Sequence, residues 1–259
     1  MKKILNISVW LLVFAGIILL LSFAVNEQKH VSCSRLSIVF NDSAGSGLMD
    51  SHTLENLIIS QFDTLPGKPL DSINTSAISR MVNSHPYIKS AAVYKSLSGE
   101  VQIDVERQKP LVRIINTNDE YYYLSESGAV LPAKPGYTPL LMVATGFISE
   151  SYKDIKDFNF YQNPYLGETS VFSSVHLLVQ TLQKHEFLNN FIEQIYINKA
   201  GEIELIPSGG GHYILLGDVS QLDKKLNNLM AFYRNGIQKM QGEVSSVNLK
   251  FTNQVVCKN

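Results

Sequence analysis

One uncharged apolar segment constrains the chain more than any other feature. It runs from Ile4 to Val25 and carries no charged side chain over 22 residues. A helix rises about 1.5 Å per residue, so this length spans roughly 30 Å, the thickness of the hydrocarbon core of a membrane. Lys2 and Lys3 precede the segment, and the positive-inside rule keeps that end in the cytoplasm. We therefore expect a cytoplasmic end over 1–3, a transmembrane helix over 4–25 and export of the rest.

A cleavable signal peptide is the alternative to an anchor. Ser22-Phe23-Ala24 has the small-x-small spacing of a cleavage site. The apolar run is longer than the roughly 7–15 residues of a typical signal core, which favours the anchor. Both interpretations place the residues after Val25 outside the cytoplasm.

Charge and cysteine content exclude several classes of function. The formal net charge of the 259 residues is −1, from 22 Lys and Arg against 23 Asp and Glu. This balance gives no basic field of the kind that attracts nucleic acid. Cys33 and Cys257 are the two cysteines, and they stand at opposite ends of the exported part. A disulfide and two free thiols both remain compatible with an oxidising compartment, whereas a zinc site needs more ligands at closer spacing.

The part from Cys33 to Pro110 has the pattern of one small α+β module. A short strand is followed by two helices, which Asp50 or Ser51 and then Asn74 are placed to cap. Apolar and polar residues alternate over 101–105, which predicts a half-buried strand. The order strand, helix, helix, strand, strand predicts a compact domain over 33–110.

After Lys109-Pro110 the sequence is mostly strand, with two amphipathic helices. Ile195 and Ile197 are spaced to pair with Ile203 and Leu205 across a turn. Further strands are expected at 111–115, 121–124, 140–145, 213–216 and 247–251, and helices near 170–185 and from Asp218 onward. We therefore predict an α+β chain with an N-terminal transmembrane helix, a β-α-α-β-β domain, and a mainly antiparallel β-domain with flanking helices over 111–259.

Catalytic and metal-binding motifs do not emerge from the sequence. The six histidines form no HxxxH or HExxH pair, and there is no G-x-S-x-G motif. Gly209-Gly210-Gly211 follows a strand and leads into another, so it predicts a hairpin loop and not a phosphate-binding turn. We predict no catalytic residues, no cofactor and no metal, and hence a protein that is not an enzyme.

Several segments resemble one protein family. The segments 85–93, HPYIKSAAV, and 99–110, GEVQIDVERQKP, resemble the second half of a POTRA domain. The tail over 247–256, VNLKFTNQVV, resembles the end of the β-domain of the bacterial cell-division family FtsQ/DivIB, and 216–218 with 224–226 resembles the start of that family's last helix. The overall pattern is most similar to versions from Bacteroidetes-type bacteria. The expected cytoplasmic end of three residues is a departure from the family.

This resemblance implies a non-catalytic scaffold of the division machinery. It implies a POTRA domain over 33–110 and an FtsQ-type β-domain over 111–259. It also implies a single-pass protein of the cytoplasmic (inner) membrane, located at the division site with its bulk in the periplasm. The implied partners are FtsB- and FtsL-like division proteins, with no nucleic acid and no small-molecule substrate.

The end of the chain is the predicted partner site. Regular alternation over 247–251 is typical of a strand, and we expect that strand to lie at a sheet edge where a partner strand can add. The candidate contacts in this C-terminal edge strand are Val247, Leu249, Lys250, Phe251, Asn253 and Val255. By resemblance, Phe251 occupies the position of an aromatic residue that binds FtsB. The alternative, that Phe251 belongs to the core, stays open.

Two other functions fit parts of the sequence. A POTRA-containing factor of envelope assembly or secretion would share the first module. A membrane-anchored enzyme acting on peptidoglycan would share the compartment, although it would need a carboxylate pair or a nucleophile in a cleft.

Overall fold

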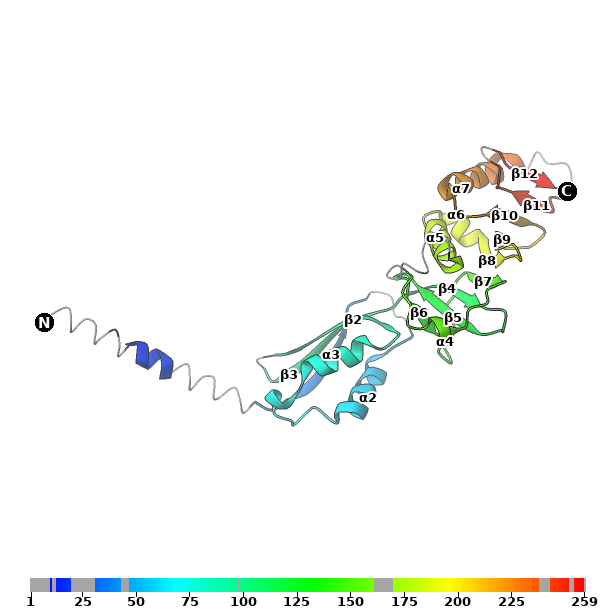
Figure 1. The fold of residues 1–259 in the computed structure, drawn as a ribbon. Coiled ribbons are helices and arrows are strands. Elements are labelled where there is room, and N and C mark those ends of the chain that lie inside the picture. Colours follow the sequence, from blue (N-terminus) through cyan, green and yellow to red (C-terminus); the bar gives the residue numbers. More distant parts are fainter. Residues whose placement is uncertain are drawn as a thin grey trace. The chain divides into compact units, whose positions relative to one another are not determined.

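A computed structural model describes residues 10, 13–19, 31–42, 47–96, 98–160, 170–237, 243–251 and 254–258 (Figure 1). Most of the predicted transmembrane segment over 4–25 lies outside these residues, and 13–19 are helical. Within the described ranges, no helix combines the length and apolar character needed to cross a membrane. The rest of the chain divides into two compact units, one of them chiefly Met49–Arg107 with the preceding strand and the other chiefly Gln108–Asn259.

The first unit has the predicted order of elements. They are β1 (Arg35–Phe40), α2 (Ser51–Phe62), the 3₁₀ turn η1 (Leu70–Ser72), α3 (Thr75–Asn83), β2 (Ile88–Lys95) and β3 (Glu100–Arg107). The strands form a sheet in the order β1-β3-β2, in which β1 is parallel and β2 antiparallel to β3. This arrangement confirms the predicted β-α-α-β-β pattern.

Local sequence signals explain why these elements begin where they do. The side chain of Asp50 accepts a hydrogen bond from the Thr53 N–H at 2.7 Å, and Asn74 accepts one from Ala77 N–H at 3.0 Å. Each cap satisfies a backbone donor that a helix N-terminus leaves unpaired. On β3, the alternating residues Val101, Ile103 and Val105 are fully buried against the helices.

The second unit is built on one nine-stranded sheet in the order β12-β11-β10-β9-β8-β7-β4-β5-β6. The strands are β4 (Pro110–Ile115), β5 (Tyr121–Ser125), β6 (Val130–Pro132), β7 (Val143–Gly146), β8 (Ile192–Ile197), β9 (Ile203–Pro207), β10 (Tyr213–Gly217), β11 (Ser246–Asn248) and β12 (Val256–Lys258). Three pairings are parallel, namely β4–β7, β7–β8 and β10–β11, and the other five are antiparallel. The sheet is thus rich in antiparallel pairs, as predicted, with parallel pairs at its centre and near one end.

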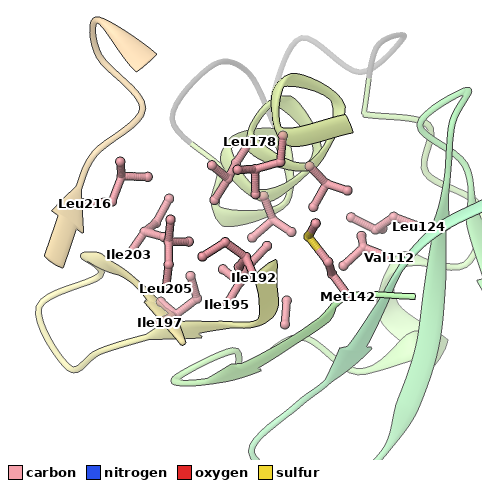
Figure 2. Close-up of a cluster of buried hydrophobic side chains, with 14 of the residues drawn as sticks. Val112, Leu124, Met142, Leu178, Ile192, Ile195, Ile197, Ile203, Leu205 and Leu216 are labelled. Atoms are coloured by element: carbon pink, nitrogen blue, oxygen red, sulfur yellow. The ribbon is translucent and has the colours of Figure 1, made fainter. Parts of the chain in front are cut away.

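Helices flank this sheet. They are α4 (Tyr152–Ile155), α5 (Val171–Gln183), α6 (Glu186–Phe191), α7 (Leu222–Ala231) and the π-helical turn η3 (Phe232–Gly236). Leu178 of α5 faces strand residues such as Ile195 and Leu205, and the thioether of Met142 reaches into the same cluster (Figure 2). The β8–β9 hairpin pairs Ile195 with Leu205 and Ile197 with Ile203, which confirms the predicted register.

Three predicted boundaries in the second unit were wrong. The strand expected at 140–145 begins only at Val143, and Leu140 is fully exposed. The last helix begins at Leu222 and not at Asp218, because the Asp218 side chain instead accepts bonds from Ser220 and Lys225. The strand expected over 247–251 is shorter, because the Asn248 side chain accepts the Lys250 N–H at 2.9 Å and turns the chain.

Candidate functional site

The C-terminal strands form one end of the nine-stranded sheet. β11 pairs in parallel with β10 on one side and antiparallel with β12 on the other. β12 is the terminal strand in the sheet order. Among the described residues, no strand pairs with the outer side of β12, so backbone N–H and C=O groups on that side can receive a partner strand. Val247 belongs to β11, so the expectation that its strand is the edge was wrong, and the edge lies one strand further along the chain.

The predicted contact residues separate into buried and accessible groups. Val247 and Leu249 are 0% and 2% exposed and belong to the core of the second unit. Val255 is half-buried against the same core. Phe251 is 48% exposed, so it is not a core residue. Asn253 lies outside the described residues.

Side chains along β12 alternate between the two faces of the sheet. Cys257 stands opposite the buried Val247 and is half-buried against the core. Val256 stands opposite Asn248 and is exposed, as is Lys258. Because directly opposed residues in an antiparallel pair share a face, Val256 and Lys258 present their side chains on the face away from the helices. An added strand would meet these two side chains on that face.

A pocket of about 390 Å³ opens beside Phe251. It lies where the chain leaves β10 and β11 and where the β8–β9 hairpin turns. Its lining residues are Ala200, Gly201, Glu202, Gly217, Asp218, Ser220, Gln221, Lys224, Lys225, Asn228, Leu249, Lys250 and Phe251. Charged and polar side chains dominate this lining, and Phe251 adds an exposed aromatic wall.

Two ion pairs fix the walls of this pocket. Lys250 pairs with Glu202 and hydrogen-bonds to it, which holds the pKa of the Glu202 carboxyl below its ordinary value. The Nζ of Lys225 lies 2.8 Å from Asp218 Oδ1, and hydrogen bonds from Lys225 and Ser220 lower the pKa of Asp218 to about 2. Both carboxylates are therefore already occupied by cations at neutral pH, and neither is poised to accept a proton from a substrate.

Gly217 allows the Lys250 side chain to cross the floor of the pocket. A Cβ at this position would lie 2.9 Å from Lys250 Cγ, and the backbone φ of +79° also favours glycine. The Gly217 position and the Glu202 pairing were not deduced from sequence. Residues 202 and 250 are far apart in the chain, and no periodic pattern links them.

An aromatic cluster lies close to β12. Phe191 and Tyr233 meet edge to face with ring centroids 4.9 Å apart, and Phe187 stacks on Phe191 at 5.1 Å. The Nε2 of His212 is 2.6 Å from the Tyr233 hydroxyl. Burial, and then the nearby Cys257, raise the pKa of Tyr233. Sequence reasoning missed this cluster because its members come from separate elements, and each fits an ordinary amphipathic pattern.

The described residues hold no cluster of three or more His, Cys, Asp or Glu side chains arranged to bind a metal ion. Cys33 and Cys257 are both free thiols.

Comparison with protein families identifies both units. A POTRA-like domain matches residues 31–106. A model described as FtsQ/DivIB, C-terminal related, matches residues 109–258, more than half of the chain. The chain belongs to the FtsQ/DivIB family. None of the curated proteins matches the sequence.

Membership of the FtsQ/DivIB family carries general implications for function. The family provides scaffolds for cell division that act through protein–protein interactions and are in general not catalytic. It also suggests a location at the membrane of the division site. The resemblance drawn from the segments 85–93, 99–110 and 247–256 is thus confirmed at the level of the family.

Proposed function

We propose that this FtsQ/DivIB protein is a divisome scaffold that binds FtsB- and FtsL-like division proteins through its C-terminal strands. One observation carries the proposal: the outer side of β12 is open, and the strand belongs to the part that matches the family's C-terminal model. A partner segment would extend the nine-stranded sheet by one strand.

Backbone groups and side chains would have different roles in partner binding. Backbone hydrogen bonds from β12 would supply affinity for an extended segment of any sequence. The exposed side chains of Val256, Lys258 and Phe251 would select among partners. Val247 and Leu249 would act indirectly, because they hold β11 on the core.

We further propose that the chain is a single-pass protein of the cytoplasmic (inner) membrane. The apolar run over 4–25 supports this topology, with 1–3 in the cytoplasm and both folded units in the periplasm. In this proposal, residues 33–110 form the POTRA domain and 111–259 the FtsQ-type β-domain.

Co-purification from the native membrane tests the function. The tagged full chain, solubilised in mild detergent, should retain the cell's FtsB- and FtsL-like proteins. A fluorescent fusion should collect at midcell, and depletion should give filaments. A chain that retains neither protein, with normal division after depletion, would falsify the proposal.

A further inference from the structure

A second pocket lies away from the C-terminal strands, at the beginning of the central parallel strands. It has a volume of about 540 Å³, within the range of pockets that take ligand groups. Its lining residues are Leu111, Leu140, Leu141, Met142, Val143, Val179, Gln183, Asn189, Asn190, Ile192 and Glu193. All of them belong to the second unit.

The pocket exists because β7 does not pair with the first residues of β8. Pairing between β7 and β8 begins only at Val143 and Gln194, although β8 itself begins at Ile192. The extended residues before Val143 are held on the other side, where Met142 C=O accepts the Arg113 N–H at 3.0 Å. A gap therefore opens between residues 140–142 and the start of β8.

The pocket has an apolar floor. Leu111, Val179 and Ile192 are 2% exposed or less, and they line the interior beside the half-buried Leu141. Leu140 is fully exposed at the mouth. Covering such a leucine with another apolar group would contribute about 2 kcal/mol. The floor and the mouth together suit an apolar anchor from another chain.

The rim of the pocket is polar. Gln183, Asn189, Asn190 and Glu193 are all exposed, and the described part of the chain provides no hydrogen bond or ion pair to any of these four side chains. Free amide groups suit the backbone of an extended segment. Among the lining residues that the structure describes, Glu193 is the only one with a charge.

We propose that this pocket docks a segment of another envelope protein that carries a leucine-like side chain next to a lysine or arginine. The apolar residue occupies the floor, and the cation pairs with Glu193. An acidic neighbour is disfavoured, because Glu193 is negative and the described lining residues provide no cation to oppose it. An apolar centre with a polar rim is the usual composition of a protein interface.

Site-specific photo-cross-linking in living cells tests the proposal. The full chain carries p-benzoylphenylalanine in place of Leu140, and mass spectrometry maps the adducts. The matched control carries the same group in place of Tyr121, which is 48% exposed on β5 and does not line the pocket. We expect an adduct from position 140 only, attached to a segment with an apolar residue within two positions of a lysine or arginine.

Charge variants of the rim complete the test. In the Leu140 photo-probe, Glu193→Lys should lower the adduct yield about tenfold, and the near-isosteric Glu193→Gln by about twofold to fivefold. Glu193 is exposed, so both variants should keep the wild-type melting temperature. The proposal is overturned by an adduct between two copies of this chain, by an adduct on a segment without a basic residue, by the absence of any adduct, or by a yield unchanged in Glu193→Lys.

Discussion

At the scale of single residues, burial divides the C-terminal segment into structural and accessible positions. Leu249 N–H donates to Leu215 C=O at 2.9 Å, and the Leu249 side chain is buried. Two residues later, Phe251 is half exposed beside the charged pocket. A strict alternation would place both side chains on one face, but the turn at Asn248 and Lys250 ends the strand before Phe251.

Alanine substitution at these two positions should have opposite effects. Phe251→Ala should leave the free energy of unfolding within about 0.5 kcal/mol of wild type, because the side chain is largely exposed. It should nevertheless abolish co-purification of the FtsB-like protein. Leu249→Ala should cost about 2–5 kcal/mol through the cavity that it leaves. Thermal melts and pull-downs of both variants provide the check, and a sharp loss of stability in Phe251→Ala would contradict the assignment.

The Lys250–Glu202 pair shows what sequence could not provide at this scale. The candidate contacts drawn from the alternation over 247–251 included Val247 and Leu249, and both side chains are buried. It could not predict a partner 48 residues away, because side-chain pairing across a sheet depends on strand order. The exposure of Phe251 likewise depends on a turn that the pattern of apolar residues does not reveal.

At the scale of elements, the start of a helix was predicted correctly where a side chain caps the backbone of the helix that follows it. Asp50 is one of the two residues predicted to cap the first helix, and Asn74 is the predicted cap of the second; both side chains accept a backbone N–H group of their helix. Asp218 has the same chemistry, yet it does not cap a helix. Its carboxylate pairs with Lys225. Gln221, the residue before the helix, has a left-handed backbone conformation with a φ of +49°. An ion pair with a residue inside the helix thus competes with the cap, and the pattern of residues alone does not decide the outcome.

A proline scan of β12 tests whether this element is the docking edge. In an antiparallel pair, successive residues on an edge strand point their N–H groups alternately toward the neighbour and toward solvent. Single substitutions Val256→Pro, Cys257→Pro and Lys258→Pro therefore sample both directions. At least one should weaken partner co-purification while it keeps the wild-type melting temperature, because it removes an outward N–H group. If every folded variant still retains the partner, the edge is not the docking site.

At the scale of the whole molecule, the order of strands in the nine-stranded sheet could not be predicted from the sequence. β4 neighbours β7 although β5 and β6 lie between them in the chain, and β10 neighbours β11 although α7 and η3 lie between them. Parallel pairing needs such crossovers, and apolar periodicity does not say which strands meet. In the first unit the sequence predicted the order of elements, because the β-α-α-β-β pattern is short and its turns are clear, but it did not predict the strand order β1-β3-β2.

The first unit should fold without the second. It has its own core, which includes Ile58, Ile78 and Ile103, and none of these residues contributes to the core of the second unit. A fragment over 31–108 should therefore melt cooperatively. Ile103→Asp should abolish that melt, because an unpaired buried charge is strongly destabilising, whereas Gln61→Asp on the exposed side of α2 should not. A fragment without a cooperative transition would show that the unit depends on the rest of the chain.

The proposed membrane span over 4–25 can be tested directly. An uncleaved span over 4–25 predicts a mature protein that retains Met1 and remains with the membrane fraction after a carbonate wash. Replacing Ile17 and Leu19 with Asp should prevent insertion, because charged groups near the centre of a span cost several kcal/mol. Intact-mass measurement and fractionation provide the readouts. The matched changes Ile17→Ala and Leu19→Ala should leave the protein in the membrane, since alanine is tolerated in a span. A mature protein that starts at Val25 would instead indicate a cleaved signal peptide, and both units would then reach the division site only through their protein partners.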